Sequence, residues 1–238
     1  KIQKIRIFIF TNIVTVLLCP ALSLGASSIK FETEELAKAM IYADASMWDK
    51  AFEITEKLSE EAARDLIQWL KLRKGVGSKS NYINFIEKNP HWPGMRLLRL
   101  RAEQKIYIDY RNEGISLDES LLVLFFQNPP QTGEGLFLFA ELISKTEETE
   151  EAFAILSKQW TTVEFSDTSF LEFTEKFRKK YELKFSERVE KLLWDGKYSA
   201  VEQLAKLSSY KLSNTEEIRL KYQKHGKNLA GALSSLSI

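Results

Sequence analysis

The sequence has very little cysteine and histidine, and this excludes several kinds of site. Its 238 residues include one cysteine, Cys19, and two histidines, His91 and His225. A disulfide framework needs at least two cysteines, and a thiolate zinc site needs several. Neither histidine has a second His or Cys at metal-ligand spacing. We therefore predict no metal and no cofactor, and a fold that is held together by its hydrophobic core.

An excess of charge of one sign is also missing. The chain has 34 Lys and Arg against 33 Asp and Glu, which leaves a net charge of +1. Binding to phosphate backbones normally requires a basic excess or a concentrated basic patch. Nucleic acid is therefore not expected as a partner. With 44% apolar and 28% charged residues, the composition is typical of a soluble globular protein.

Residues 1–26 have the layout of a secretory signal peptide. A basic start is followed by an apolar run over residues 7–18 and by small residues that predict cleavage after Gly25 or Ala26. The apolar run is short for a membrane span and includes polar side chains. We expect export and no stable membrane span after cleavage.

Two alternatives to a cleaved signal stay open. The segment can remain as an uncleaved anchor, or Cys19 can carry a lipid. Leu18 is bulky where a lipoprotein signal has a small residue, and Pro20 follows the cysteine, so lipidation is disfavoured.

Alternating β-strand patterns with hairpin turns are absent, and helical patterns follow one another from residue 31 onward. A polar break at residues 44–46 predicts the end of one helix and the start of another. Ser59 is a candidate N-cap for the next helix, and Pro90 predicts that a further helix ends at Asn89. Later helical patterns cover residues 116–127, 133–145, 148–160, 167–181, 186–196, 197–207 and 214–226.

Small residues recur near the starts of several helices. Ala51, Ala152 and Ala200 each precede a larger apolar residue. Small side chains there let neighbouring helices approach closely, as in stacked helix hairpins. The spacing is irregular. We predict an all-α fold over residues 27–238, a right-handed superhelix or α-solenoid that is similar to tetratricopeptide arrays but degenerate.

Several stretches occur in the order found in one enzyme family. They are "MWDKAFEI", "LIQWLKLR", "FIEKNPHWPGMRLLRLRAEQ", "FFQNPPQTGEGLFLFAELI", "AFAILSKQW" and "RVEKLLWDGKYSAVEQL". Between residues 37 and 225 the chain resembles the superhelical N-terminal region of soluble lytic murein transglycosylases. The main markers are Asn89-Pro90, Trp92-Pro93, Arg101-Ala102-Glu103, Pro129-Pro130 with Thr132, Gly133 and Gly135, Trp160, and Leu192-Leu193-Trp194 with Gly196.

The resemblance implies a periplasmic protein whose helices curve into a U or ring beside a lysozyme-like domain. Members of this family cleave the bond between N-acetylmuramic acid and N-acetylglucosamine and leave a 1,6-anhydromuramyl end. One glutamic acid acts first as the acid and then as the base, and this requires a raised carboxyl pKa.

The family's catalytic motif is not present as a whole. The motif has Glu-Ser followed by Gly-Leu-Met-Gln, and here Glu119-Ser120 occurs without the second element. We interpret Glu119 as a residue in the first turn of a helix and predict no catalytic residue. The lysozyme-like domain is expected to be missing, with the superhelix incomplete at its C-terminal end, as in a fragment or a truncated gene product. This chain alone is predicted to be inactive.

The stretch "NPHWPGMRLLRLRAE" carries the candidate ligand contacts. Trp92 lies in a turn between prolines, where an exposed indole can stack on a sugar, and Arg96 and Arg99 can meet carboxylates of peptidoglycan. The alternative interpretation is a helix junction, with Trp92 packed as a wedge, Pro93 in the first helical turn and Glu103 near solvent.

Other side chains are interpreted structurally. The pairs Arg99 with Glu103 and Glu172 with Lys176 have the spacing of ion pairs on a helix surface. The remaining tryptophans are expected to fill seams between helices, and these are Trp48, Trp69, Trp160 and Trp194.

The sequence therefore predicts the non-catalytic superhelical region of a periplasmic lytic murein transglycosylase. Its partners would be peptidoglycan glycan strands and a lysozyme-like catalytic domain. The alternative is a tetratricopeptide-like periplasmic scaffold that binds a protein partner. A third possibility is a degraded gene product without a function.

Overall fold

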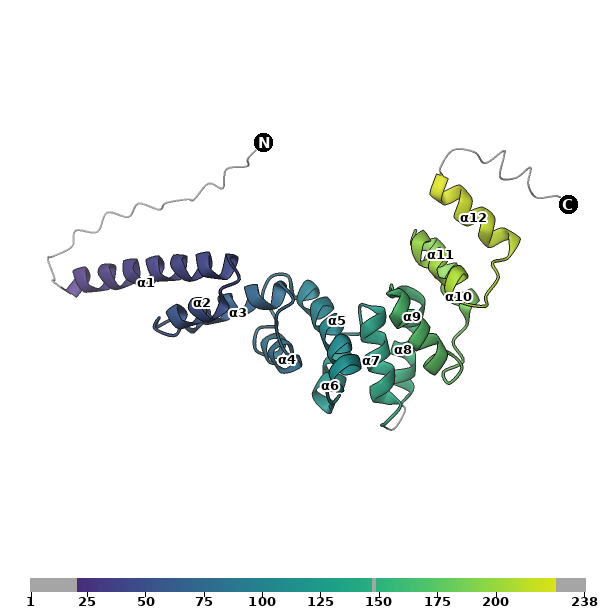
Figure 1. The fold of residues 1–238 in the computed structure, drawn as a ribbon, viewed down its shortest axis with the longest axis horizontal. Coiled ribbons are helices and arrows are strands. Elements are labelled where there is room, and N and C mark those ends of the chain that lie inside the picture. Colours follow the sequence, from purple (N-terminus) through teal and green to yellow (C-terminus); the bar gives the residue numbers. More distant parts are fainter. Residues whose placement is uncertain (1–20, 147–148, 226–238) are drawn as a thin grey trace. The chain divides into compact units, whose positions relative to one another are not determined.

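The computed structural model describes residues 21–146 and 149–225. Within these residues all regular secondary structure is helical (Figure 1). The one β-type contact in that part of the chain is an isolated parallel bridge between Thr132 and Glu164. The prediction of an all-α fold is confirmed. The apolar run at residues 7–18, on which the predicted signal peptide depends, lies outside the described residues.

The chain divides into two compact units, of which the first ends at Ile67. It contains α1 (Ala21–Asp44), α2 (Trp48–Thr55) and the start of α3 (Glu61–Arg73). Ala39, Ala43 and Ala51 are almost completely buried. These small side chains allow α1 and α2 to pack closely, and the predicted break at residues 44–46 is confirmed.

The predicted N-cap at Ser59 is wrong. α3 begins at Glu61, two residues later, so Ser59 does not stand at the cap position. Its hydroxyl instead donates to Glu32 Oε1 at 2.6 Å. The tertiary fold brings the Glu32 carboxylate close to Ser59, so the hydroxyl binds this carboxylate and not the start of the helix.

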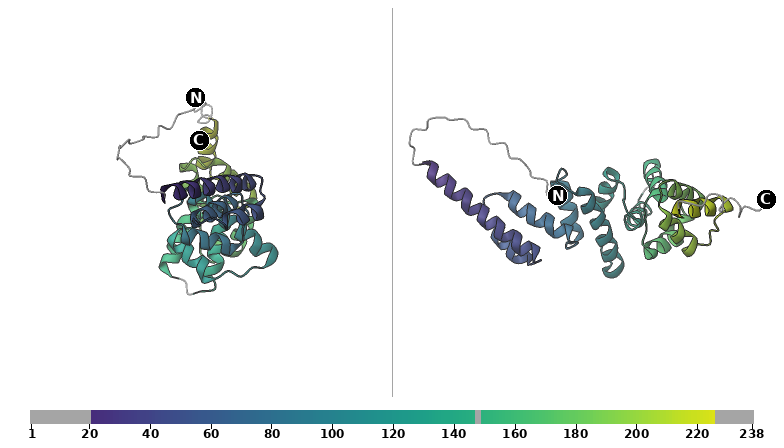
Figure 2. Two further views of the ribbon diagram at one scale, coloured as in Figure 1. Left: turned by 90° about the vertical axis from the view of Figure 1, so that its left-hand side faces the viewer. Right: turned by 90° about the horizontal axis from the view of Figure 1, so that it is seen from above.

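The second unit starts at Gln68 and packs its helices in chain order. Most helices contact the next one or the next but one along the chain, as helices in stacked hairpins do, and Figure 2 lets this succession be followed from two further directions. The helices are α4 (Lys79–Lys88), α5 (Met95–Glu113), α6 (Glu119–Gln127), α7 (Gly133–Ile143), α8 (Glu150–Thr162), α9 (Asp167–Phe173), α10 (Phe185–Trp194), α11 (Tyr198–Leu207) and α12 (Asn214–His225).

Short polar side chains set the starts of many of these helices. The residue before the helix accepts a hydrogen bond from the third helical N–H, which satisfies a donor that has no partner inside the helix. This occurs at Ser78, Asp118, Thr132, Thr149 and Ser166. Each such cap contributes about 1 kcal/mol to stability.

The core of the second unit is built largely from aromatic rings. α7 is buried along its whole length, and Phe137 forms edge contacts with Tyr107 and with Phe177 at 5.4 Å between ring centroids. Trp160 is buried, stacks on Phe173 at 5.5 Å and donates its indole N–H to the Lys184 carbonyl. Its predicted role in a helix seam is confirmed.

The same prediction is wrong for Trp194, whose side chain is 78% exposed. Leu192 and Leu193 occupy the inner positions of α10 and are completely buried. Each residue of an α-helix turns about 100° from the one before it, so the residue after Leu193 faces outward. Trp48 and Trp69 are half-buried.

After α9 the chain continues as a π-helical turn over Thr174–Arg178. The aromatic residues Phe173, Phe177 and Tyr181 are spaced by four and are all buried. Residues four apart lie on one face of a helix, so these three rings form one buried row along α9 and the π turn.

The junction between α4 and α5 agrees with most of its sequence interpretation. Asn89 is the C-cap of α4, directly before Pro90, as predicted. Trp92 is packed as the junction interpretation expected, but its ring contacts lie on Phe85 of α4 at 5.5 Å and on Trp69 of α3 at 6.1 Å. α5 begins only at Met95, so Pro93 lies ahead of the helix and not in its first turn.

No helix within the described part of the chain has both the length and the apolar character needed to span a membrane.

Candidate functional site

The most unusual polar group in the second unit is Glu103 of α5. Its side chain is 5% exposed, so the expectation that it lies near solvent is wrong. The carboxylate accepts hydrogen bonds from the backbone N–H of Gln131 at 3.0 Å and of Thr132 at 2.8 Å. The Thr132 hydroxyl donates a third bond at 2.6 Å. Glu103 therefore holds the loop that leads into α7, and it does not pair with Arg99 as the spacing on the helix surface suggested.

Thr132 links this carboxylate to the start of α7. Its hydroxyl donates to Glu103 and accepts from the backbone N–H of Gly135 at 3.0 Å, so one side chain serves as a helix cap and as a partner of the buried acid. A Cβ atom on Gly135 would lie 2.3 Å from Glu103 Oε2. Glycine at this position lets the acid approach the helix backbone.

Gly133 permits a second close approach. A Cβ atom there would lie 2.2 Å from the Phe165 ring. The Gly133 N–H donates to the Glu164 carbonyl at 2.7 Å. The loops before α7 and before α9 therefore lie side by side, and α7 begins at Gly133, where the predicted helical pattern begins.

Burial raises the pKa of Glu103 from an ordinary 4.5 to about 7. The hydrogen bonds from Thr132 and Gln131 oppose this rise, and the nearby charge of Glu134 adds to it. Glu134 is itself buried and accepts a hydrogen bond from the Ser169 hydroxyl at 3.0 Å. Two carboxyl groups thus lie under the start of α7.

The end of α8 carries buried positive charge. Arg188 of α10 is completely buried and donates to the carbonyls of Trp160 and Val163, the latter at 2.9 Å. Its guanidinium also lies over the rings of Trp160 and Phe165, 4.9 Å from each centroid. Burial lowers the pKa of Arg188 to about 9. A guanidinium stays protonated in proteins, so this lowering reflects the cost of burying the charge.

A groove with polar walls opens over this junction. It encloses about 400 Å³, and we call it the polar groove. Residues from α5, from the starts of α7 and α9 and from the loop before α11 form its walls, namely Arg96, Leu100, Gln104, Gln131, Thr132, Glu134, Glu164, Phe165, Ser166 and Lys197. The buried Glu103 lies behind Gln131 and Thr132, so it fixes the position of part of this wall.

The structure separates the three predicted ligand contacts. Arg96 is exposed and lines the polar groove. Arg99 contributes to a small cavity of about 10 Å³ shared with α6, and its Nε has no hydrogen-bond partner within the described residues. Trp92 is half-buried between Trp69 and Phe85. Contact of these residues with a glycan stays a prediction, and only Arg96 lies in the groove.

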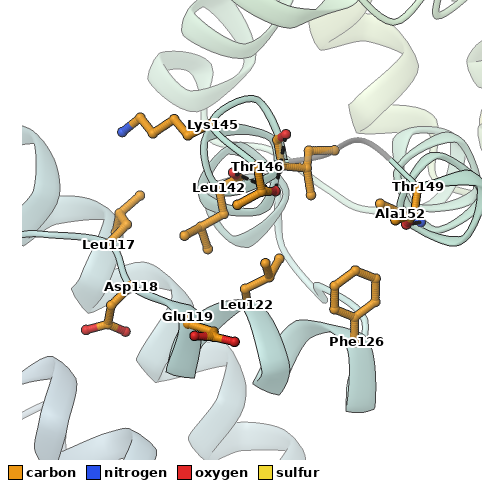
Figure 3. A pocket seen from close by; sticks show the side chains of 11 residues that line it. Leu117, Asp118, Glu119, Leu122, Phe126, Leu142, Lys145, Thr146, Thr149 and Ala152 are labelled. Atoms are coloured by element: carbon orange, nitrogen blue, oxygen red, sulfur yellow. Dashed lines mark hydrogen bonds between the residues drawn. The ribbon is translucent and has the colours of Figure 1, made fainter.

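A second pocket, of about 470 Å³, lies between α6, the end of α7 and the start of α8, and we call it the apolar pocket (Figure 3). Figure 3 shows Leu122 and Phe126 on the side opposite Leu142, with Asp118 and Glu119 along one edge. Asp118 caps α6, and Glu119 lies in the first turn of that helix, as predicted.

Two further polar links tie helices together and differ from the pairs expected on one helix. Glu172 accepts from the Tyr107 hydroxyl at 2.6 Å and pairs with Arg111 at 2.7 Å. Lys176 pairs with the buried Glu141 of α7. The predicted pair of Glu172 with Lys176 is therefore wrong, because each side chain has a partner on another helix.

Metal-binding chemistry has no built site in the part of the chain that the structure describes. No group of three or more His, Cys, Asp or Glu side chains there has the arrangement to hold an ion. His91 is exposed in the turn after α4, and His225 is the last residue of α12.

Sequence reasoning missed the buried charges, although one signal was present for Glu103. This residue is followed at the third and fourth positions by Ile106 and Tyr107, both buried, so it borders the inner stripe of α5. For Arg188 the flanking Val189 and Leu192 gave a similar hint. The partners of both charges are backbone groups 25 or more residues away, and no local pattern names them.

Comparisons with known proteins give no family for the chain. A scan against models of protein families, a search of curated proteins and a search of solved structures each found no match. The resemblance to lytic murein transglycosylases therefore stays a prediction from the residues themselves.

Proposed function

We propose that the chain is the non-catalytic helical region of a periplasmic protein of the lytic murein transglycosylase type, and that it holds peptidoglycan strands for cleavage by a lysozyme-like domain. The observation that carries this proposal is the meeting of its sequence markers in space. Two of the markers meet at one junction: the Glu103 carboxylate of the first accepts from the Thr132 hydroxyl of the second and packs against Gly135 of the same stretch. The contact between these residues supports the resemblance, because residues that are distant in sequence belong to one packed site.

The carboxyl groups of this junction support a structural role rather than a catalytic one. A pKa of about 7 is the value that a general acid needs at neutral pH, so Glu103 meets one requirement of the chemistry. However, its side chain is buried, its oxygens accept from three donors, and Gly135 packs against it. A glycosidic oxygen has no room to reach this proton.

Glu119 is the other acid to consider, because it belongs to the sole Glu-Ser pair of the sequence. It is exposed in the first turn of α6, where a negative side chain is favoured by the helix dipole. The Gly-Leu-Met-Gln element that accompanies the pair in the family does not follow it. We therefore assign it no part in bond cleavage.

The test is sedimentation of the purified full chain with murein sacculi, followed by chromatography of the soluble fraction. We expect the chain to sediment with sacculi and to release no 1,6-anhydromuropeptides, and chitin particles serve as the control for general polysaccharide binding. Sedimentation no greater than with chitin would reject the proposal. Release of anhydromuropeptides would overturn its non-catalytic part, and Glu119→Gln would then show whether that acid is responsible.

A periplasmic scaffold that binds a protein partner is the second candidate, and the apolar pocket is the observation that favours it. Leu122, Phe126 and Leu142 offer apolar surface of the kind that receives side chains of a bound helix. If this candidate is correct, crosslinking in whole cells captures a partner that Leu122→Lys releases, and sacculi are not bound. Binding to sacculi that is unchanged in Leu122→Lys supports the first candidate.

A further inference from the structure

The charged side chains in the walls of the polar groove differ in whether they already have a hydrogen-bond or ion-pair partner. Glu134 accepts a hydrogen bond from the Ser169 hydroxyl, and Glu164 Oε1 lies 3.6 Å from Lys197 Nζ. Lys197 also donates to the Thr162 carbonyl at 2.5 Å. Arg96 alone among these four has no hydrogen bond or ion pair with any described residue. The groove therefore presents one cation that is free to bind a ligand.

Two amide side chains extend the binding surface beyond this cation. Arg96, Leu100 and Gln104 follow one another at intervals of four residues and line the groove along one side of α5. Arg96 and Gln104 are thus separated along the helix axis by about 12 Å, which is longer than one sugar ring. Gln131 lies in the same wall, and its Nε2 is buried without a partner within the described residues.

The balance of charge argues against a ligand with several negative charges. Glu134 and Glu164 are in the groove together with Arg96 and Lys197, so the four side chains sum to no net charge. A phosphate dianion or a polyanion would meet two carboxylates at close range. A single carboxylate is a better partner, because the planar guanidinium can donate two parallel hydrogen bonds to it.

We propose that the polar groove binds a disaccharide unit of peptidoglycan, with Arg96 paired to a carboxylate on the muramyl side and Gln104 and Gln131 bonded to acetamido and hydroxyl groups. This rests on the proposed function and gives it a site. The carboxylate can belong to the free lactyl group or to the stem peptide attached there, and both present the same anionic group to the guanidinium.

Calorimetric titration of the purified full chain with three probes tests this proposal. The probes are the disaccharide of N-acetylglucosamine and N-acetylmuramic acid, its stem-tetrapeptide conjugate, and neutral diacetylchitobiose. We expect at least one carboxylate-bearing probe to bind roughly tenfold more tightly than diacetylchitobiose. The probe with the larger preference identifies the source of the carboxylate.

Arg96→Gln removes the charge and keeps an amide of similar length, and we expect it to abolish that preference. Arg101→Gln is the matched control, because Arg101 is an exposed arginine on the same helix that does not line the groove. Equal affinity for all three probes, or equal losses in the two variants, would overturn the assignment. Both variants alter exposed residues, and matching thermal unfolding curves would show that each is folded.

Sedimentation with sacculi distinguishes failure of the groove assignment from failure of the proposed function. If the natural chain and Arg96→Gln both sediment while the titration shows no preference for a carboxylate, this groove assignment is wrong and the proposed function stands. If the natural chain does not sediment, the proposed function is wrong. Preference of the groove for a carboxylate-bearing probe would still support the assignment in that case, because the titration does not depend on intact sacculi.

Discussion

The start of α7 and the end of α8 each bind a buried charged side chain through main-chain groups, and the two charges have opposite signs. At the start of α7 a buried carboxylate, Glu103, accepts from backbone N–H groups. At the end of α8 a buried guanidinium, Arg188, donates to backbone carbonyls. Neither charge forms an ion pair with a described residue of opposite sign. The signs match the partial charges of the two helix ends, so the fold uses main-chain dipoles in place of buried ion pairs.

The two regions differ in how their charges respond to solution conditions. Glu103 can become neutral by binding a proton, because its pKa of about 7 lies within the ordinary pH range. Arg188 has no such route, since a guanidinium remains charged. The end of α8 should therefore be the more sensitive to mutation, and the start of α7 the more sensitive to pH.

The largest effect is expected from Arg188→Met. Methionine fills much of the space between Trp160 and Phe165 but leaves the carbonyls of Trp160 and Val163 without their donor. We expect a loss of about 3–4 kcal/mol in the free energy of unfolding, measured by urea denaturation. Lys197→Met removes a half-exposed donor from the same helix end and should cost about 1 kcal/mol or less. Equal losses of unfolding free energy in the two variants would show that the burial of Arg188 does not make its hydrogen bonds more stabilising than those of Lys197.

The next effect is a dependence of stability on pH at the start of α7. The folded chain keeps a proton on Glu103 up to about pH 7, whereas the unfolded chain releases it near 4.5. Between these values the folded state binds more protons, so stability falls as pH rises and then levels off above the folded pKa. We expect this acid to contribute a fall of about 2–3 kcal/mol.

Glu103→Gln is the variant that isolates this contribution, because its amide does not titrate. Urea denaturation at several pH values between 4.5 and 8 should give a smaller slope for the variant than for the natural chain. Parallel pH profiles for the two proteins would show that Glu103 titrates at an ordinary pKa in the folded state.

The smallest effect compares two helix caps. Thr132 and Thr149 cap α7 and α8 through the same type of bond, but only Thr132 also donates to a buried carboxylate. Replacing either threonine by valine removes the cap, at about 1 kcal/mol. Thr132→Val should cost a further 1–2 kcal/mol because the buried carboxyl group of Glu103 loses a hydrogen-bond partner. Equal changes in the urea midpoint for the two variants would indicate that the bond to Glu103 adds nothing.

The sequence predicted those features that depend on neighbouring residues. The break at residues 44–46 and the end of α4 before Pro90 follow from local backbone chemistry, and both are observed. The burial of Ala51, Ala152 and Ala200 follows from their place at the starts of helices. These are short-range effects, and one sequence contains all the information they need.

Features that depend on distant partners were not predictable in the same way. The hydrogen bonds of Glu103 and Arg188 cross 25 or more residues, and the helical period alone places charged side chains outside. The predicted burial of Trp194 is wrong for a related reason, because its angular position after the buried Leu193 turns it outward although it is hydrophobic. Arg96 and Trp92 are close in sequence, but only Arg96 lines the polar groove.

The π-helical turn at Thr174–Arg178 has a consequence for how this stretch tolerates changes in length. Such a turn accommodates one residue more than an α-helix does over the same rise. Deleting the exposed Glu175 would leave Phe173 and Phe177 three positions apart, a spacing that an ordinary α-helix also keeps on one face. The aromatic packing beneath α7 can thus be retained by two chains that differ in length by one residue.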